Sequence, residues 1–150
     1  MNGVNDLTAF GDAELAAVRD YLRRRVGPDA DRLAEETIVT AFAERESCAG
    51  SPRAWLLGIA TRLVPERAEE RRLRAARRHG SPVGALASLA RGDRDALLLH
   101  VWGGLCEAEC AAALGVPEET LRSRLARARA HVRERMRPGA DAFEVLRESP

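Results

Sequence analysis

Lysine is absent from this 150-residue sequence, and all of its 24 basic residues are arginine. With 23 acidic residues the formal net charge is only +1, which excludes a uniformly basic nucleic-acid-coating protein. Any contact with DNA must therefore come from local clusters of arginine. Arginine suits bidentate contacts to phosphate and guanine, although a codon bias accounts for the missing lysine at least as well.

Aromatic residues and long apolar runs are also scarce. Aromatics make up 4% of the chain, so the core must be built from Leu, Ala and Val. No stretch approaches the ~20 apolar residues of a membrane span, and the first residues lack the basic start and apolar run of a signal peptide. We therefore expect a cytoplasmic protein with no membrane insertion.

Cysteine is limited to Cys48, Cys106 and Cys110, which we expect to be reduced in that compartment. Cys106 and Cys110 lie one helical turn apart, and His100 and His131 occur in the same half, so a zinc site is conceivable. A buried, apolar Cys110 is the stronger interpretation, because no tetrahedral ligand spacing is visible. The prediction is no metal.

Catalytic patterns are missing as well. The sequence contains no Ser/His/Asp set, no phosphate-binding Gly-rich loop and no paired carboxylates beside a plausible base. His79, His100 and His131 are isolated from such partners. We therefore expect a protein that is not an enzyme, with no catalytic residues, no cofactor and no small-molecule substrate.

Helical periodicity runs through the first half, and no stretch alternates with the two-residue period of a strand. Asp12 caps a helix that continues to about Val26, where Gly27-Pro28 ends it. A second helix covers 31–45, and Ser51-Pro52 opens a third that Pro65 kinks or ends. The predicted apolar face of the first helix is Leu15, Val18 and Leu22. That of the second is Leu33, Thr37, Ile38, Ala41 and Phe42, and that of the third is Trp55, Leu56, Ile59, Ala60 and Leu63.

A Gly/Pro/Ser-rich stretch, 79–85, separates the two periodic halves. We therefore predict an all-α fold of two small helical domains, 1–78 and 93–150, joined by a short linker at 79–92. Leu86–Leu89 is apolar enough to join the second domain. Residues 1–12 are polar and expected to fray, and the tail carries Phe143, Val145 and Leu146, which would let it dock as a short helix.

The second half has the layout of a helix-turn-helix. A helix with Leu97, Leu98, Val101 and Trp102 on its apolar face stops at Gly103-Gly104. A short helix follows from about Cys106 to Leu114, then Gly115-Val116-Pro117 turns the chain into a third helix that starts near Glu118. In this layout the last helix enters the major groove of DNA.

The last helix is amphipathic and strongly basic. Its predicted buried positions, Leu121, Leu125, Ala128 and Val132, follow helical spacing. Between 122 and 137 the other faces carry seven arginines against one acid, Glu134. The alternative is an ordinary bundle helix with a solvated face, but this imbalance favours DNA binding over a salt-bridged surface.

Three stretches in this order resemble the sigma factors of bacterial RNA polymerase, in the small extracytoplasmic-function (ECF) group. They are YLRRRVGPDADRLAEETIVTAF, SPRAWLLGIATRL and LGVPEETLRSRLARARAHVRE. The third is the most specific, because its turn and basic helix match the family pattern L-G-I-P-x-G-T-V-R-S-R-L-x-R-A-R nearly residue for residue. With the lead-in RDALLLHVWGGL, the resemblance covers most of residues 15–137.

The resemblance implies that the first domain binds the polymerase clamp and reads the minus-ten element as a melted strand. The second domain would read the minus-thirty-five element as duplex. The implied partners are core RNA polymerase, promoter DNA and an anti-sigma factor. The positions that match the family's polymerase contacts are Arg32, Glu35, Glu36 and Thr37. Those that match its contacts to the melted strand are Thr61, Arg62, Glu66, Glu69, Glu70 and the loop 44–52. Those that match its contacts to the duplex are Pro117, Thr120, Arg122, Ser123, Arg124 and Arg127.

Several of these positions depart from the family pattern. Arg32 stands for Asp, Glu35 for Gln and Arg62 for Asn; Glu69 and Glu70 lie where the family tends to be basic; and Glu119 replaces Gly at the start of the basic helix. Acids next to a DNA strand repel phosphate. Two hypotheses follow: a promoter-specificity subunit, or a degenerate sigma-like DNA-binding regulator or protein-binding decoy that does not support promoter melting.

Overall fold

The computed structural model describes residues 10–79, 81–136 and 146–147, and every regular element within them is helical. The prediction of an all-α fold is confirmed. In chain order the elements are α2 (Asp12–Val26), η1 (Gly27–Asp29), α3 (Ala30–Ala43), η2 (Arg45–Ser47), α4 (Pro52–Leu63), α5 (Glu66–Arg78), η3 (Pro82–Ser88), α6 (Arg91–Val101), α7 (Glu107–Leu114) and α8 (Glu118–Arg135). No helix in the described part of the chain is long and apolar enough to cross a membrane.

Local sequence signals set where these helices begin and end. Ser51 caps α4, because its Oγ accepts a hydrogen bond from the Ala54 N–H at 3.2 Å, and Pro52 occupies the first helical position. The same helix ends at Leu63, where Val64 turns extended ahead of Pro65. These boundaries agree with those predicted from the sequence.

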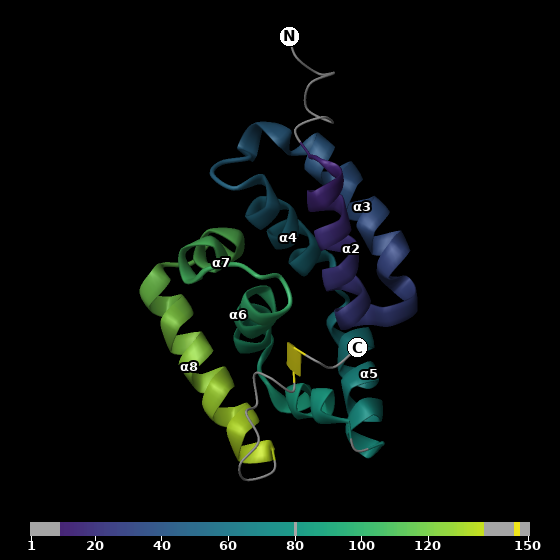
Figure 1. The fold of residues 1–150 in the computed structure, drawn as a ribbon, viewed down its shortest axis with the longest axis vertical. Coiled ribbons are helices and arrows are strands. Elements are labelled where there is room, and N and C mark those ends of the chain that lie inside the picture. Colours follow the sequence, from purple (N-terminus) through teal and green to yellow (C-terminus); the bar gives the residue numbers. More distant parts are fainter. Residues whose placement is uncertain (1–9, 80, 137–145, 148–150) are drawn as a thin grey trace.

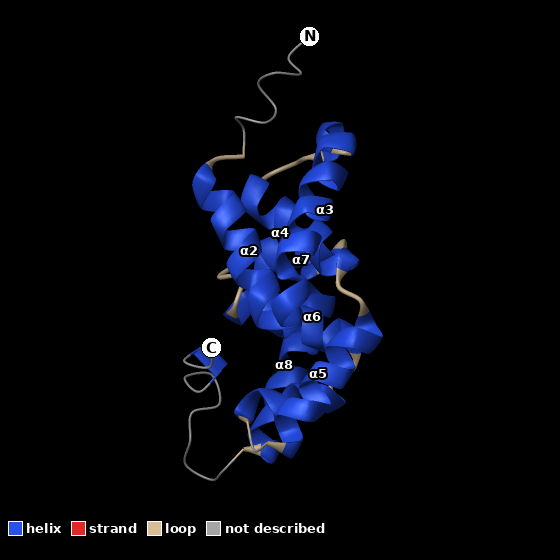
Figure 2. Cartoon of the chain, turned by 90° about the vertical axis from the view of Figure 1, so that its right-hand side faces the viewer, coloured by secondary structure: helices blue, strands red, loops and turns tan. Residues whose placement is uncertain are grey.

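The helices form two groups that lie side by side (Figure 1). In the N-terminal half, defined here as α2–α5, the helices α2, α3 and α4 pack on one another. In the C-terminal half, defined as α6–α8, the three helices form the helix-turn-helix. The two halves meet where α4 packs on α7, and the side view shows them as one continuous helical body (Figure 2).

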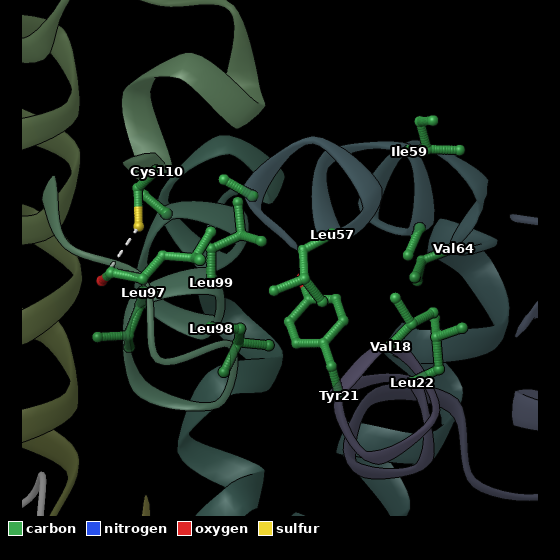
Figure 3. Packing of buried hydrophobic residues seen from close by; sticks show 14 of the residues in the cluster. Val18, Tyr21, Leu22, Leu57, Ile59, Val64, Leu97, Leu98, Leu99 and Cys110 are labelled. Atoms are coloured by element: carbon green, nitrogen blue, oxygen red, sulfur yellow. Dashed lines mark hydrogen bonds between the residues drawn. The ribbon is translucent and has the colours of Figure 1, made fainter. Parts of the chain in front are cut away.

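One apolar core runs through both halves. Tyr21 and Leu57 from the N-terminal half and the run Leu97–Leu99 of α6 are all fully buried. Figure 3 shows Leu57 beside the Tyr21 ring, with the leucines of α6 facing them. Burial of each such side chain stabilises the folded state by about 1.5–3 kcal/mol, so the contact between the halves rests on shared apolar packing.

The stretch expected as a linker is folded. Within it, Pro82–Ser88 forms η3, which packs along α5 and also contacts α8. The piece Leu86–Leu89 bonds to the second group, because Arg94 of α6 donates to the carbonyls of Leu86 and Leu89 and Ser88 is bonded to His131 of α8. Leu86 is fully buried. Gly84 permits this packing, since a Cβ there would lie 2.3 Å from the Arg77 Cα. The division into domains at 78 and 93 remains a prediction.

Several side chains differ in burial from what the sequence predicted, among them Phe42, Trp55 and Phe10. Phe42, expected in the buried stripe, is 40% exposed, and the Arg45 guanidinium sits 4.7 Å from its ring centre. Trp55, expected on a buried face, is only partly buried and stacks on Phe10 at 5.9 Å between ring centroids. Phe10 itself is buried although it lies in the stretch expected to fray.

The predicted tail helix lies mostly outside the described residues, as do Phe143 and Val145. Leu146 is described and is fully buried. Its carbonyl accepts a hydrogen bond from the Trp102 indole N–H at 3.0 Å. The tail therefore returns to the body of the molecule at this residue.

Candidate nucleic-acid interface

The helix-turn-helix is built by α7, the turn 115–117 and α8. α7 ends at Gly115, which adopts the left-handed conformation (φ +65°) that an L-residue with a Cβ avoids. α8 then buries Leu121, Leu125, Ala128 and Val132, as its periodicity predicted. The opposite face of α8 is left open to solvent.

The residues expected to read duplex DNA lie on or beside this open face. Arg124 is half-buried beside Gly92; the exposed members of the set are Pro117, Thr120, Arg122, Ser123 and Arg127. The small side chains of Ser123 and Ala126 occupy the middle of the face, so α8 can approach a groove floor closely. Arg122 and Arg127 flank this middle strip.

Arg122 is paired with two carboxylates in this conformation. Its guanidinium lies 3.2 Å from Glu107 of α7 and 3.2 Å from Glu118, one turn earlier in α8. All three side chains are exposed enough for solvent to screen the pairs, so each contributes little to stability. A phosphate or a base edge can therefore replace the carboxylates.

Arg127 on the other flank is held by Asp93 in a bidentate pair. Its Nε and Nη2 donate to the two carboxylate oxygens at 3.2 and 3.0 Å. These hydrogen bonds, with the charge of Asp93, raise the pKa of Arg127. Because Asp93 engages the Nε and Nη2 side of the guanidinium, the Nη1 group does not contact Asp93. Nη1 can donate to a base edge while the carboxylate holds the guanidinium plane in place.

The residues expected to face polymerase lie along α3. Arg32, Glu35 and Glu36 are exposed there, and Arg32 sits 3.7 Å from Glu36. Thr37 does not belong to this surface: it is fully buried, and its hydroxyl donates to the Leu33 carbonyl at 2.7 Å. Its place in the predicted buried stripe is confirmed, and its assignment to the polymerase face is wrong.

The residues expected to contact a melted strand divide in the same way. Arg62 is exposed and pairs with Glu44 at 2.8 Å, and Glu66 is exposed in the first turn of α5. Thr61 is buried, with its hydroxyl bonded to the Leu57 carbonyl at 2.7 Å and the Tyr21 hydroxyl at 2.8 Å. In this conformation the expected strand contact at Thr61 is wrong.

The resemblance placed Glu69 on the surface beside a DNA strand, and that expectation is wrong. It is 1% exposed and accepts hydrogen bonds from Arg25 at 2.6 and 2.7 Å and from Arg94 at 2.9 Å. Burial alone would raise the pKa of Glu69, but the two arginines outweigh burial and hold that pKa below its usual value. Glu70, the next residue, is half-buried and lies 3.6 Å from Arg74 on its own helix.

The thiols and imidazoles make local contacts. Burial, with the nearby Cys106 and acidic side chains, raises the pKa of Cys110 to about 12, so this thiol stays protonated and unreactive. Cys110 donates a weak hydrogen bond to the Leu105 carbonyl, and His131 is bonded to Ser88. Across the described ranges, no group of three or more His, Cys, Asp or Glu is placed to hold a metal ion.

Comparison with known proteins adds independent observations. Residues 83–132 match the family described as "Sigma-70, region 4". The chain is 37% identical over 122 residues to the ECF RNA polymerase sigma factor SigC of Mycobacterium tuberculosis and to the probable RNA polymerase sigma-C factor of Mycobacterium bovis. Each match covers 67% of this chain and 66% of the relative, slightly less than two thirds of its length.

Two solved structures have similar folds. The sigma factor RpoE from Bartonella quintana, solved with the anti-sigma factor NepR, aligns with a TM-score of 0.65 at 22% identity over 86% of this chain and 95% of its own. CnrH, solved with the cytosolic domain of CnrY, aligns with a TM-score of 0.58 at 26% identity over 88% and 85%. The likeness to RpoE is one of fold.

Proposed function

Because the chain belongs to the sigma-70 family of RNA polymerase sigma factors, in its ECF group, we propose that it directs core RNA polymerase to specific promoters and initiates transcription there. It acts by binding, without catalytic residues of its own. The observation that carries the proposal is the basic, exposed face of α8 within a helix-turn-helix. The site of action is the cytoplasm, where promoter DNA and polymerase are.

Reading of the minus-thirty-five element is assigned to α8. Its small central side chains admit the helix to the major groove, and the flanking Arg122 and Arg127 reach base edges or phosphates. The exposed groups that remain near them, Thr120 and Ser123, add short hydrogen-bonding contacts. Pro117 and the start of the helix lie near a phosphate in such a pose.

Polymerase binding is assigned to the exposed face of α3, and strand contact to Arg62 and Glu66. On α3 the polar groups Arg32, Glu35 and Glu36 adjoin the exposed apolar Val39 and Phe42. Exposed apolar side chains beside charged ones are typical of a surface that a protein partner covers.

An anti-sigma factor is the third proposed partner. RpoE and CnrH were solved with a protein of that kind and with the CnrY cytosolic domain, respectively. The support in this chain is its small size and the exposure of both proposed binding faces, each of which a single partner is able to cover.

A degenerate, sigma-like decoy is the alternative. The exposed Arg32 favours it, because a basic residue stands on the proposed polymerase face where the family has an acid. Run-off transcription with purified core polymerase on genomic fragments separates the two. Specific transcripts support the proposal, whereas duplex binding without retention by core polymerase in a pull-down supports the decoy.

A further inference from the structure

A cavity of about 430 Å³ opens beside α2, on a part of the surface that the proposed function does not use. Its lining comes from four segments: α2, the start of α4, the end of α6 and the described piece of the tail. The residues assigned above to polymerase, to the melted strand and to the duplex all lie outside this lining. The volume falls within the range of small-molecule sites, about 300–1,000 Å³, so the chemistry of the lining indicates which ligand would fit.

The lining is strongly basic. Three arginines reach it from three different segments: Arg24 of α2, Arg53 of α4 and Arg147 of the tail. Asp20 is the only acid among the described lining residues, so the lining carries a formal net charge of +2. Among the described residues, neither Arg24 nor Arg147 forms an ion pair with a carboxylate. Cations that gather at a concave surface without matching acids raise the local potential and attract an anion.

Arg53 is held in place beside the cavity by a backbone contact. Its Nη2 donates to the Gly103 carbonyl at 2.7 Å. The next residue, Gly104, has a φ of +67°, and a Cβ there would lie 3.1 Å from the same Nη2. Glycine therefore leaves space for the guanidinium against this turn. One hydrogen bond leaves most of the five donors of the side chain available to another acceptor.

Arg147 is brought to the cavity by the anchored tail. The Trp102 indole N–H donates to the Leu146 carbonyl at 3.0 Å, and Leu146 itself is fully buried. This anchor places the next residue, Arg147, in the same lining as Trp102. An arginine on anchored backbone loses less conformational freedom on binding than one on a free chain end.

The rest of the lining includes an apolar surface. Ala13, Ala16 and Ala17 lie three and four residues apart on one face of α2, and their methyl groups form a wall of the cavity. Val101 and Trp102 add a branched aliphatic side chain and an indole. A flat ring packs well on such surfaces by apolar contact and stacking. A bare phosphate ion would engage the arginines and leave this wall in water.

We propose that this cavity, named here the α2–α6 cavity, binds a nucleoside polyphosphate as an effector. The phosphates lie on the three arginines, because the planar guanidinium fork matches two phosphate oxygens at once. The base lies against the alanine wall and Trp102. A single carboxylate carries less charge than the excess on the lining, whereas a chain of two or three phosphates balances it. No bond is made or broken, and the proposal does not depend on the proposed function.

The test titrates the purified full-length chain by calorimetry, without polymerase and in magnesium-free buffer. ATP and GTP are the nucleotide probes, tripolyphosphate supplies the charge without a ring, and guanosine supplies the ring without the charge. Arg24→Gln is the variant. Arg19→Gln is the matched control, because it removes the same charge from an exposed position of the same helix, outside the lining.

We expect one molecule of ATP, GTP or either to bind per chain, with an affinity that falls as salt rises. Arg24→Gln should weaken this binding about 10-fold or more, because charge-assisted hydrogen bonds are lost, and Arg19→Gln should bind as the parent does. Tripolyphosphate should bind more weakly than the nucleotide. The proposal is overturned by no saturable nucleotide binding below about 1 mM, by equal losses in both variants, or by tripolyphosphate binding as tightly as the nucleotide.

Ala16→Leu is the second variant, in case the first fails to fold. Ala16 is exposed and leucine is a good helix former, so α2 should persist while the cavity is partly filled. Nucleotide binding should weaken, and tripolyphosphate binding should not. In nuclear magnetic resonance of the parent, nucleotide should shift the indole N–H signal of Trp102 and not that of Trp55, which lies outside the lining. A shift of Trp55 alone, or an Ala16→Leu chain that binds nucleotide as the parent does, would refute the site.

Discussion

At the scale of single residues, the same side chain type serves opposite purposes in this protein. Arg94 is 1% exposed and bonded to Glu69 and to two carbonyls, so its role is to join parts of the chain. Arg127 is mostly exposed and pairs with Asp93. An exposed ion pair can be replaced by a contact to DNA at little cost in free energy, as recognition of DNA requires. A buried ion pair cannot.

Replacing Arg127 by Ala should lower the affinity for the best minus-thirty-five duplex and relax preference at one base position. An arginine bidentate to guanine supplies roughly 1–3 kcal/mol of discrimination. Arg135→Ala, near the end of α8, is the control and should at most weaken all sequences alike and reduce the salt slope by about 0.9. Titration against single-base variants at two salt concentrations measures both effects, and equal losses on every sequence for both variants would assign α8 to backbone contact alone.

Asp93→Asn should show whether Asp93 orients the Arg127 side chain or acts on DNA binding only through its negative charge. The amide keeps the size of the side chain but loses the bidentate carboxylate, so Arg127 becomes free to reach phosphate. We expect affinity for unrelated duplex to rise, because a negative charge is removed, and base discrimination at the Arg127 position to fall toward that of Arg127→Ala. The same titration tests this, and unchanged discrimination would mean that Asp93 does not orient the arginine.

At the scale of the secondary-structure elements, the turn between α7 and α8 depends on one backbone conformation. Gly115 has φ +65°, and a Cβ there would meet no atom within 4 Å, so any penalty for a substitution comes from the backbone alone. The left-handed conformation costs an ordinary L-residue about 1–2 kcal/mol, and asparagine less.

Gly115→Ala should therefore lower the free energy of unfolding by about 1 kcal/mol, and Gly115→Asn by clearly less. Urea denaturation followed by circular dichroism measures both. A larger loss for asparagine than for alanine would show that space, rather than φ, limits this position.

The helix α4 provides a second contrast, between Leu57 and Trp55. Leu57 is fully buried between the halves, so Leu57→Ala should cost about 2–5 kcal/mol. Trp55 is only partly buried against Phe10, so Trp55→Ala should cost less, about 2 kcal/mol, below the ~3–5 kcal/mol typical of a core tryptophan. Thermal or urea unfolding of the two variants gives the order, and the reverse order would place the centre of the core elsewhere.

At the scale of the whole molecule, Glu69 links stability to pH. Its pKa is lowered in the folded chain, so its contribution is complete above the ordinary glutamate pKa of about 4.5 and is lost as the pH falls below it toward the folded value. Between those values the unfolded chain binds more protons, and stability must therefore rise with pH.

The free energy of unfolding should accordingly fall more steeply below pH 4.5 in the parent than in Glu69→Gln, which has no proton to gain at this site. Urea titrations between about pH 3 and 6 measure the difference. Glu70→Gln should follow the parent curve. Parallel curves for parent and Glu69→Gln would mean that the Glu69 pKa is not lowered by folding.

Most helices and their boundaries in this protein are local properties, and the sequence by itself determined them. The exceptions are α5 and η3, which no prediction named, and the start of α2, where Gly11 rather than Asp12 is the N-cap and makes no side-chain capping bond. Caps such as Ser51-Pro52, terminators such as Gly115 and the apolar spacing of Leu121, Leu125, Ala128 and Val132 act within one or two turns. The same local pattern identified α8 and its arginines as the candidate DNA-reading helix. It also carried the resemblance by which the family was predicted correctly.

Which polar side chains are buried was decided only by tertiary structure. Arg25, Glu69 and Arg94 stand in arginine-rich or acidic helical segments that read as solvated surface, and Thr61 as a strand contact. No spacing rule brings residues 25, 69 and 94 together, because their proximity arises from the packing of three different helices. A charge is stable in the interior only where an opposite charge meets it, and that meeting depends on how the two halves close on each other.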